Sequence, residues 1–236
     1  MIEDRTERRS RRQVLAGLSS AAFAAVLAGC STTRPMPQFL PEGPVAPPPP
    51  SGVDPYYAAM YGPMPQERFP IPPVDLSKVP PQFYRREVAY PTSERVGTIV
   101  VDTSSFYLYL VQENGRALRY GVGLGREGFA WKGRARVGWK QVWPKWTPPD
   151  EMIARQPELV EYSADNGGMP PGLQNPLGAR ALYIFQGNKD TLYRIHGSPE
   201  YWTIGTAVSS GCVRMMNQDV IDLYGRVPVD SPIVVT

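Results

Sequence analysis

The sequence contains very little histidine and cysteine: one histidine, His196, and two cysteines, Cys30 and Cys212, among 236 residues. A protein zinc site takes three or four histidine, cysteine or carboxylate ligands, and no cluster of histidines and cysteines exists here to supply them. The scarcity therefore argues against a resident metal, and we expect no cofactor. It also narrows the candidate chemistry, because a cysteine thiol that needs a histidine as its base has only one to use.

The sequence also lacks a strong charge excess and an apolar run long enough to cross a membrane. Charged residues make up 20% of the chain, and the formal net charge is +3. Five arginines lie within the first 12 residues, so the remainder is nearly neutral and indicates no nucleic acid partner. The apolar stretch 14–29 is shorter than the roughly 20 residues of a membrane-spanning helix.

The first 30 residues predict an export signal that ends at a lipid-attachment site. Arginines precede the apolar stretch, as is typical of a signal, and 10–15 resembles the twin-arginine consensus, with a general secretory signal as the alternative. Leu27-Ala28-Gly29-Cys30 matches a bacterial lipobox, with an ordinary cleavage site as the alternative. Lipid on Cys30 would remove the one intrachain disulfide partner of Cys212, which favours a chemical role for that thiol.

Proline is abundant in one region only. Of the 27 prolines, 17 lie between Pro35 and Pro91, and such a segment favours extended polyproline structure with little buried surface. We therefore predict an export signal over 1–29, a disordered proline-rich tether over 30–96, and one folded domain over 97–236.

Short alternating strands and tight turns predict a mainly β, sandwich-like domain. Asn114-Gly115 predicts a two-residue hairpin, and Asn217 is the expected N-cap of a short helix after the cysteine loop. The Gly-, Pro- and Trp-rich segment 123–178 predicts a loop-rich lid over a substrate groove, with a helical turn at 150–155. We expect the strands at 98–102, 105–111, 118–122, 181–185, 191–196 and 233–235.

The candidate chemistry centres on Cys212. Gly211 before it lets the backbone approach a substrate and aim N–H groups at a developing oxyanion. His196, on the less apolar face of its strand, would take the thiol proton and later deliver it to a leaving amine. Arg214 offers a planar, bidentate donor for a carboxylate. These residues together predict acyl transfer through a thioester.

Two motifs resemble the signature of the bacterial L,D-transpeptidase catalytic domain. They are His196-Gly197-Ser198 and, after a loop, Ser209-Ser210-Gly211-Cys212-Val213-Arg214-Met215; Asn175-Pro176-Leu177-Gly178 and the 217–227 helix extend the resemblance over about 97–236. The resemblance implies an enzyme that cross-links peptidoglycan stem peptides. Its cysteine attacks the L-centre carbonyl of a diamino acid, usually meso-diaminopimelate, and releases the terminal D-alanine. An amine then resolves the thioester.

The resemblance also implies a role for each matching residue. Cys212 is the nucleophile and His196 the general acid/base; the Gly197 carbonyl orients the imidazole, Ser210 and Gly211 line the oxyanion region, and Ser209 and Arg214 hold the loop and the substrate. Many relatives have a histidine where this chain has Ser210, so any secondary role of that histidine is absent. Carbapenems acylate the corresponding cysteine in many members.

The acceptor of the acyl group stays open at this stage. A second diaminopimelate-containing stem would give cross-linking, water would give an L,D-carboxypeptidase, and an envelope protein would give protein-to-peptidoglycan attachment. A non-catalytic wall-binding lipoprotein is the alternative from another class, although a pure binder needs neither Cys212 nor His196. The signal and lipobox imply a periplasmic location with a lipid anchor in the membrane, the outer one in a Gram-negative cell.

Overall fold

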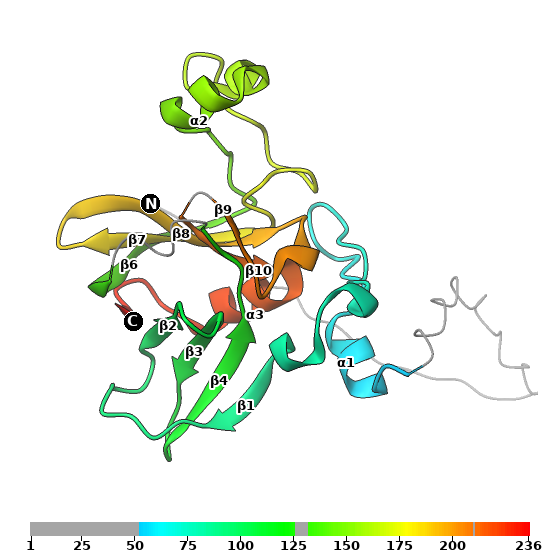
Figure 1. The fold of residues 1–236 in the computed structure, drawn as a ribbon, viewed down its shortest axis with the longest axis vertical. Helices are drawn as coiled ribbons and strands as arrows, with labels where there is room; N and C mark the ends of the chain where they lie inside the picture. Colours follow the sequence, from blue (N-terminus) through cyan, green and yellow to red (C-terminus); the bar gives the residue numbers. More distant parts are fainter. Residues whose placement is uncertain (1–51, 126–131, 210) are drawn as a thin grey trace, which may run out of the picture. The chain divides into compact units, whose positions relative to one another are not determined.

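A nine-stranded mixed sheet dominates the part of the chain that the structure describes (Figure 1). The computed structural model describes residues 52–125, 132–209 and 211–236, which belong to one unit spanning 47–236. Side by side in the sheet lie β1 (Arg86–Ala89), β4 (Arg116–Gly121), β3 (Tyr107–Val111), β2 (Ile99–Asp102), β11 (Pro232–Val235), β6 (Gly133–Val142), β7 (Arg180–Gln186), β8 (Lys189–Ser198) and β10 (Val213–Met216).

Only two strand pairs in this sheet are parallel, β11 with β2 and β10 with β8. The other neighbours run antiparallel, as expected for strands joined by tight turns. A second, two-stranded sheet joins β5 (Leu124–Gly125) to β9 (Ala207–Ser209).

One apolar core joins the two halves of the large sheet. Leu108 on β3 and Ile99 on β2 belong to the same buried cluster as Ile195 on β8 and Val213 on β10. The helix α3 (Asn217–Arg226) contributes Val220 and Leu223 to this cluster, so strands from both halves enclose it (Figure 1). The mainly β, sandwich-like prediction is confirmed.

The strands expected from apolar alternation are present, and so is the hairpin. Asn114 and Gly115 have φ angles of +58° and +65°, the conformation that a tight two-residue turn requires. The helical turn at Asp150–Arg155 is also present, as α2. Asn217 is the first helical residue of α3, not its N-cap, which is Met216.

The uninterrupted lid predicted over 123–178 is wrong for residues 133–142. They form β6, which pairs with β11 and β7 in the middle of the sheet. Arginine, lysine and glycine alternate with its apolar residues and hide the strand pattern from sequence reasoning. The remaining insertion, 143–179, carries α2 and the 3₁₀ helix η3 (Pro157–Tyr162), and Figure 1 shows it extending away from the sheet.

The disordered tether predicted over 30–96 is wrong for the described residues 52–96. The segment 53–85, called the N-terminal strap below, contains α1 (Pro55–Met60), η1 (Leu76–Lys78) and η2 (Pro81–Phe83), and β1 follows it. Aromatic and aliphatic side chains give it the buried surface that its prolines cannot: Tyr61 is 1% exposed and clusters with Leu76, Val79 and Tyr84. Residues 30–51 lie outside the described part.

A buried polar cluster fastens the N-terminal strap to α3. The Tyr61 hydroxyl donates to Asp219 at 3.2 Å and accepts from the Arg85 amide at 2.6 Å. The Arg85 guanidinium lies 3.7 Å from Asp219 and 3.1 Å from Asp222. Burial raises the pKa of Asp219 to about 7, although Arg85 and Tyr61 favour its charged form.

No helix among the described residues has the length and apolar character needed to cross a membrane.

Candidate active site

Strand register brings the candidate catalytic residues onto one face of the sheet. In the parallel pair β8–β10, Arg214 lies opposite His196 and Val213 lies opposite Ile195. Continuing that register by one residue beyond the start of β10 places Cys212 opposite Arg194, whose amide and charge act on its thiol. Because strand side chains alternate, these four residues share the face opposite to buried Ile195 and Val213, called the outer face below.

His196 is buried, with 4% of its surface exposed, and does not project into an open groove as predicted. It lies on an internal strand, between β7 and β10. Its Nδ1 lies 2.6 Å from the carbonyl oxygen of Gly197. A carbonyl only accepts, so Nδ1 carries the proton and the neutral ring presents an unprotonated Nε2. That tautomer suits a general base.

The surroundings of His196 keep its imidazole neutral at physiological pH. Burial lowers its pKa to about 4, and the nearby cations Arg214 and Arg194 act in the same direction. The carbonyls of Gly197 and Pro176 favour the charged ring, with a smaller combined effect. A neutral base is therefore ready to accept a proton, and the imidazolium that forms is stabilised by two carbonyls.

Cys212 is partly accessible, yet its thiol is closely surrounded by protein. Burial raises the pKa of the thiol above its ordinary value, while the Arg194 amide and the charges of Arg194 and Arg214 favour the thiolate. The raised pKa of the thiol and the lowered pKa of the His196 imidazole therefore leave both groups neutral near neutral pH.

Asn217 holds together the segments that surround His196. Its side-chain oxygen accepts from the Ala179 amide at 2.9 Å, and its side-chain nitrogen donates to the Ser198 carbonyl at 3.4 Å. A Cβ at Gly178 or at Gly197 would lie 2.4 Å or 2.2 Å from that same side-chain oxygen. Both glycines are therefore required for the close packing, and sequence reasoning, which gave Asn217 a capping role, missed its part in the site.

Asn175 fastens the end of the insertion 143–179 beside the site. It is 1% exposed; its side-chain nitrogen donates to the carbonyls of Pro144 and Pro170 at 3.1 and 3.0 Å, and its side-chain oxygen accepts from the Leu177 amide at 2.9 Å. These bonds fix the turn that carries the Pro176 carbonyl toward His196. The motif therefore has a direct structural link to the base.

Arg214 is held on both its backbone and its side chain. It exchanges two backbone hydrogen bonds with Gly123, at 2.8 and 2.9 Å, and its guanidinium forms a 2.6 Å ion pair with Glu200. The structure fixes the orientation of this cation, and Glu200 already occupies part of its donor capacity. The side chain of Ser209, and Ser210 as a whole, lie outside the described part of the chain.

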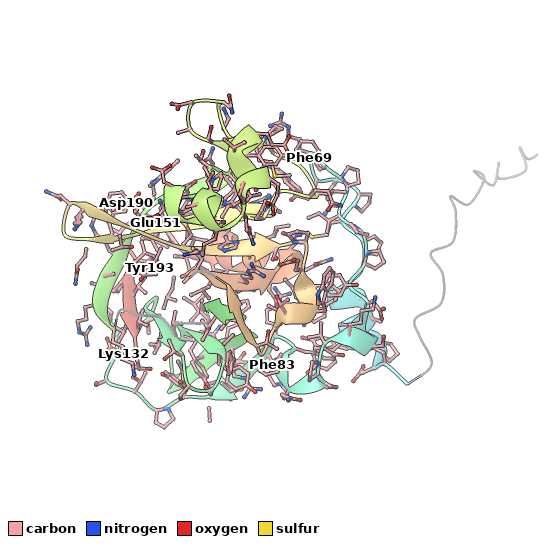
Figure 2. All side chains as sticks on the ribbon, turned by 45° about the horizontal axis from the view of Figure 1, so that its top comes forward. Phe69, Phe83, Lys132, Glu151, Asp190 and Tyr193 are labelled. Atoms are coloured by element: carbon pink, nitrogen blue, oxygen red, sulfur yellow. The ribbon has the colours of Figure 1, made fainter. Side chains whose placement is uncertain are left out.

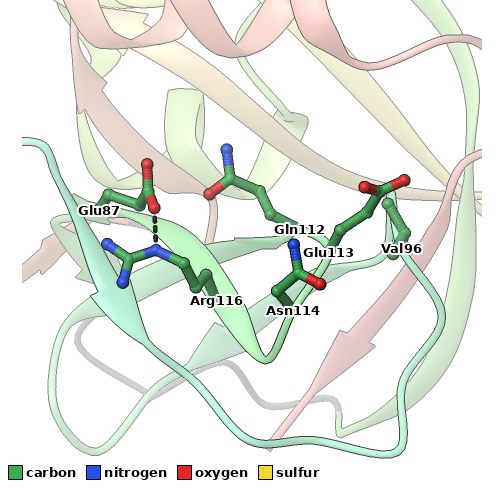
Figure 3. Close-up of a pocket in the computed structure, with 6 residues that line it drawn as sticks. All are labelled: Glu87, Val96, Gln112, Glu113, Asn114 and Arg116. Carbon is green, nitrogen blue, oxygen red and sulfur yellow. Dashed lines mark hydrogen bonds and ion pairs between the residues drawn. The ribbon is translucent and has the colours of Figure 1, made fainter.

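A cavity of about 160 Å³ lies at the end of β8. Its wall includes Ser198 at the end of β8, Leu173 from the insertion and Pro72 from the N-terminal strap. A larger depression of about 450 Å³ lies at the β3–β4 turn, and its lining includes the Glu87–Arg116 ion pair and, across the pocket, Val96 (Figure 3). It lies in the opposite half of the sheet from β8 and β10, whereas the smaller cavity is lined by Ser198 and Asn217, which are close in sequence to the candidate residues.

Among the described residues, no three His, Cys, Asp or Glu side chains converge as metal ligands would.

The comparisons with known proteins agree with this arrangement. The family model of the YkuD L,D-transpeptidase catalytic domain matches residues 97–235, more than half of the chain, and the chain therefore belongs to that family. It is 39% identical over 100 residues to YbiS, a probable L,D-transpeptidase of Escherichia coli K12. The matched stretch covers 41% of this chain and 29% of YbiS. It is 31% identical over 155 residues to ErfK/SrfK of the same strain, also a probable L,D-transpeptidase. That match covers 62% of this chain and 46% of ErfK/SrfK.

A solved Brucella melitensis structure titled "Probable carnitine operon oxidoreductase caia" covers 65% of this chain and 94% of its own, at 44% identity and a TM-score of 0.47. Because that TM-score is below 0.5, membership rests on the family model and the curated relatives. The chain spans less than half the length of both curated relatives described above.

Proposed function

We propose that the protein is a peptidoglycan L,D-transpeptidase that forms a thioester between Cys212 and a stem peptide. The observation that carries the proposal is the shared outer face of β8 and β10, where the sequence's only histidine lies opposite Arg214, two positions along from Cys212. The neutral state of His196 supports it, because only an unprotonated imidazole can accept the thiol proton. Membership of the L,D-transpeptidase family points to the same chemistry.

In the first half of the proposed reaction, Nε2 of His196 takes the proton of the Cys212 thiol. The sulfur bonds to the L-centre carbonyl carbon of the diamino acid, and backbone N–H groups at Ser210, Gly211 and Cys212 stabilise the oxyanion. His196 then returns the proton to the amide nitrogen, the C–N bond breaks, and D-alanine leaves. The 2.6 Å contact between Nδ1 and the Gly197 carbonyl supports this role, because it keeps the ring oriented throughout.

In the second half, an amine attacks the thioester carbonyl carbon and His196 takes its proton. The C–S bond then breaks, the new amide leaves, and His196 returns the proton to the Cys212 sulfur. A second diaminopimelate-containing stem peptide is the proposed acceptor, which gives cell wall cross-linking. Water in its place would make the protein an L,D-carboxypeptidase, and an amine of an envelope protein would make it a protein-attachment enzyme. Arg214 and Ser209 are proposed to hold the substrate and the loop, with no metal or organic cofactor in the reaction.

We further propose that the enzyme acts in the periplasm and that Cys30 carries a lipid anchoring it to the membrane. The arginine-rich start and the sequence Leu27-Ala28-Gly29-Cys30 support this location. Labelling of cells with a fatty acid analogue tests it: label should appear on the wild-type protein and disappear in Cys30→Ser.

Incubation with disaccharide tetrapeptides tests the proposed activity. Cross-linked dimers with release of D-alanine are expected from the wild-type protein, and none from Cys212→Ala. His196→Ala should lower the rate of D-alanine release at least about a hundredfold, the scale of lost general-base catalysis. Tripeptides without dimers would indicate the carboxypeptidase. Binding without any product would contradict the proposed activity and favour a wall-binding lipoprotein.

A further inference from the structure

Three side chains stack in a row across neighbouring strands of the outer face. Register places Trp139 on β6 opposite Tyr183 on β7, and Tyr183 opposite Arg194 on β8. The rings of Trp139 and Tyr183 stack with their centroids 3.9 Å apart and their planes at 26°. The Arg194 guanidinium lies 4.2 Å from the centroid of the Tyr183 ring. We call these three residues the stacked row.

The stacked row is held rigidly from both sides. Asp190 binds the Arg194 guanidinium through two hydrogen bonds, of 2.7 and 2.9 Å, and Figure 2 shows Asp190 on β8. The Tyr183 hydroxyl hydrogen-bonds to the side-chain oxygen of Gln141 at 3.1 Å. Since the rotamers of Tyr183 and Arg194 are fixed, the indole of Trp139 has a preorganised surface behind it.

A β-bulge at Gly138 turns Trp139 onto the outer face. Val137 faces the core and is fully buried, so a regular strand would point Trp139 toward the core as well. The register shift between Val137 and Trp139 reverses that direction, and Lys140 instead faces α3, where it donates to the Tyr224 carbonyl at 2.6 Å. Gly138 is required there, because a Cβ would come within 2.1 Å of the Phe185 ring.

The bulge leaves a large aromatic side chain exposed on the same face of the sheet as the candidate site. Trp139 is 43% exposed, whereas Tyr183 behind it is only 8% exposed. A second register irregularity occurs on the other side of β7, where Leu192 adopts a φ of +65° and the turn brings Asp190 to Arg194. Two departures from regular pairing therefore flank the same aromatic residue, and both serve to build the stacked row.

The stacked row leads directly to the candidate nucleophile. Arg194 directly precedes Ile195, the partner of Val213, and Cys212 directly precedes Val213, so about three strand spacings separate Trp139 from Cys212. At about 4.8 Å per spacing, this distance is about 14 Å. In a tetrapeptide donor, the attacked carbonyl belongs to the third residue, so three extended residues of about 3.4 Å each, plus the link to the sugar, span a similar length.

We propose that Trp139 is a subsite for a sugar ring of the donor's glycan strand. This inference rests on the proposed function, which supplies the donor. One face of a pyranose presents C–H groups that pack on an exposed indole, while its hydroxyl and acetamido groups remain at the edge of the ring, accessible to water or polar neighbours. The indole is the exposed end of the stacked row, at the distance from Cys212 that the stem peptide would span. Trp139 positions the donor and takes no part in bond making.

Calorimetric titration of the Cys212→Ala protein, which binds without turnover, tests this subsite. The two ligands are a disaccharide tetrapeptide and the same tetrapeptide without sugars. The sugar-linked ligand should bind about fivefold more tightly, the scale of one aromatic stacking contact. Adding Trp139→Ala should remove this difference, Trp139→Phe should keep most of it, and Tyr56→Ala, which removes an exposed aromatic from α1, should leave it unchanged.

Equal affinity of the two ligands in the protein that retains Trp139 would overturn the subsite. An equal loss of affinity for both ligands in Trp139→Ala would also overturn it, because the indole would then contact the peptide. Failure of both ligands to bind would overturn it as well. A different result would contradict the proposed function: the protein that retains Cys212 would release no D-alanine from either donor. A circular dichroism melt of each variant checks that it folds.

Discussion

Arg214 lies directly opposite His196 on the parallel strands β10 and β8, so the cation and the imidazole share one face of the sheet. Burial and this cation together hold the pKa of His196 at about 4. The same cation favours ionisation of Cys212, whose pKa burial nonetheless raises above its ordinary value. The Arg214 cation therefore acts on both the imidazole and the thiol, and the consequences for each can be measured.

Alkylation of Cys212 by iodoacetamide should still accelerate as the pH rises through 9. The thiolate is the reactive form, and burial raises the pKa of this thiol, so the thiolate fraction keeps increasing beyond neutral pH. Quenched samples analysed by mass spectrometry give the rate, and Cys212→Ala identifies the modified residue. A rate that levels off below pH 8 would instead indicate a thiolate already formed at rest.

The stability of the fold should fall in acid because of His196. Its folded pKa of about 4 lies below the ordinary value of 6.5, so the unfolded chain binds the proton more readily. The contribution is fully present above pH 6.5 and is lost as the pH falls toward 4, up to about 3 kcal/mol. Denaturant unfolding of wild type and His196→Gln between pH 7 and 4.5 measures it. Identical pH slopes in the two proteins would exclude His196 as the cause.

Tyr61→Phe should lower the free energy of unfolding by about 1–2 kcal/mol. The hydroxyl that it removes is buried and bonded to both Asp219 and the Arg85 amide, so the change leaves buried partners without a bond. Tyr107→Phe is the matched control, because its hydroxyl makes a single exposed contact of 3.4 Å. Equal unfolding midpoints for both variants would show that the N-terminal strap is not fastened through Tyr61.

Gly138→Ala should destabilise the protein by about 1–3 kcal/mol, the range for overpacking, because the new methyl meets the Phe185 ring. Gly225→Ala is the control: a Cβ there meets nothing within 4 Å inside α3. That change should stabilise the helix by about 0.5–1 kcal/mol. Thermal unfolding of both variants measures the contrast, and a neutral Gly138→Ala would mean that the bulge tolerates a side chain.

Local signals in the sequence predicted much of the fold. Apolar alternation identified the strands around Leu108 and Ile195, and Asn114-Gly115 identified a hairpin, because each depends on a few neighbouring residues. The strand β6 was missed, since its arginines and its one lysine bind partners distant in sequence, as Lys140 binds the Tyr224 carbonyl. The N-terminal strap was missed because its proline content hides aromatic residues that pack only once α3 is present.

In the candidate site, too, local motifs could be recognised from the sequence, whereas contacts between distant strands could not. The motifs around His196 and Cys212 predict a nucleophile and its base, since short sequence patterns carry that chemistry. Arg194 and Trp139 could not be found this way, because their relation to Cys212 depends on register across four strands and on a bulge. Gly138, which directly follows the alternating Ala135-Arg136-Val137, is a local signal of that bulge.

The central claim is that Cys212 carries the acyl group, and intact mass spectrometry of the protein mixed with a tetrapeptide donor or a carbapenem tests it most directly. The account predicts one covalent adduct per chain, equal in mass to the donor minus D-alanine or to the whole carbapenem, and no adduct on Cys212→Ala. No adduct on the wild-type protein, or the same adduct on Cys212→Ala, would contradict it.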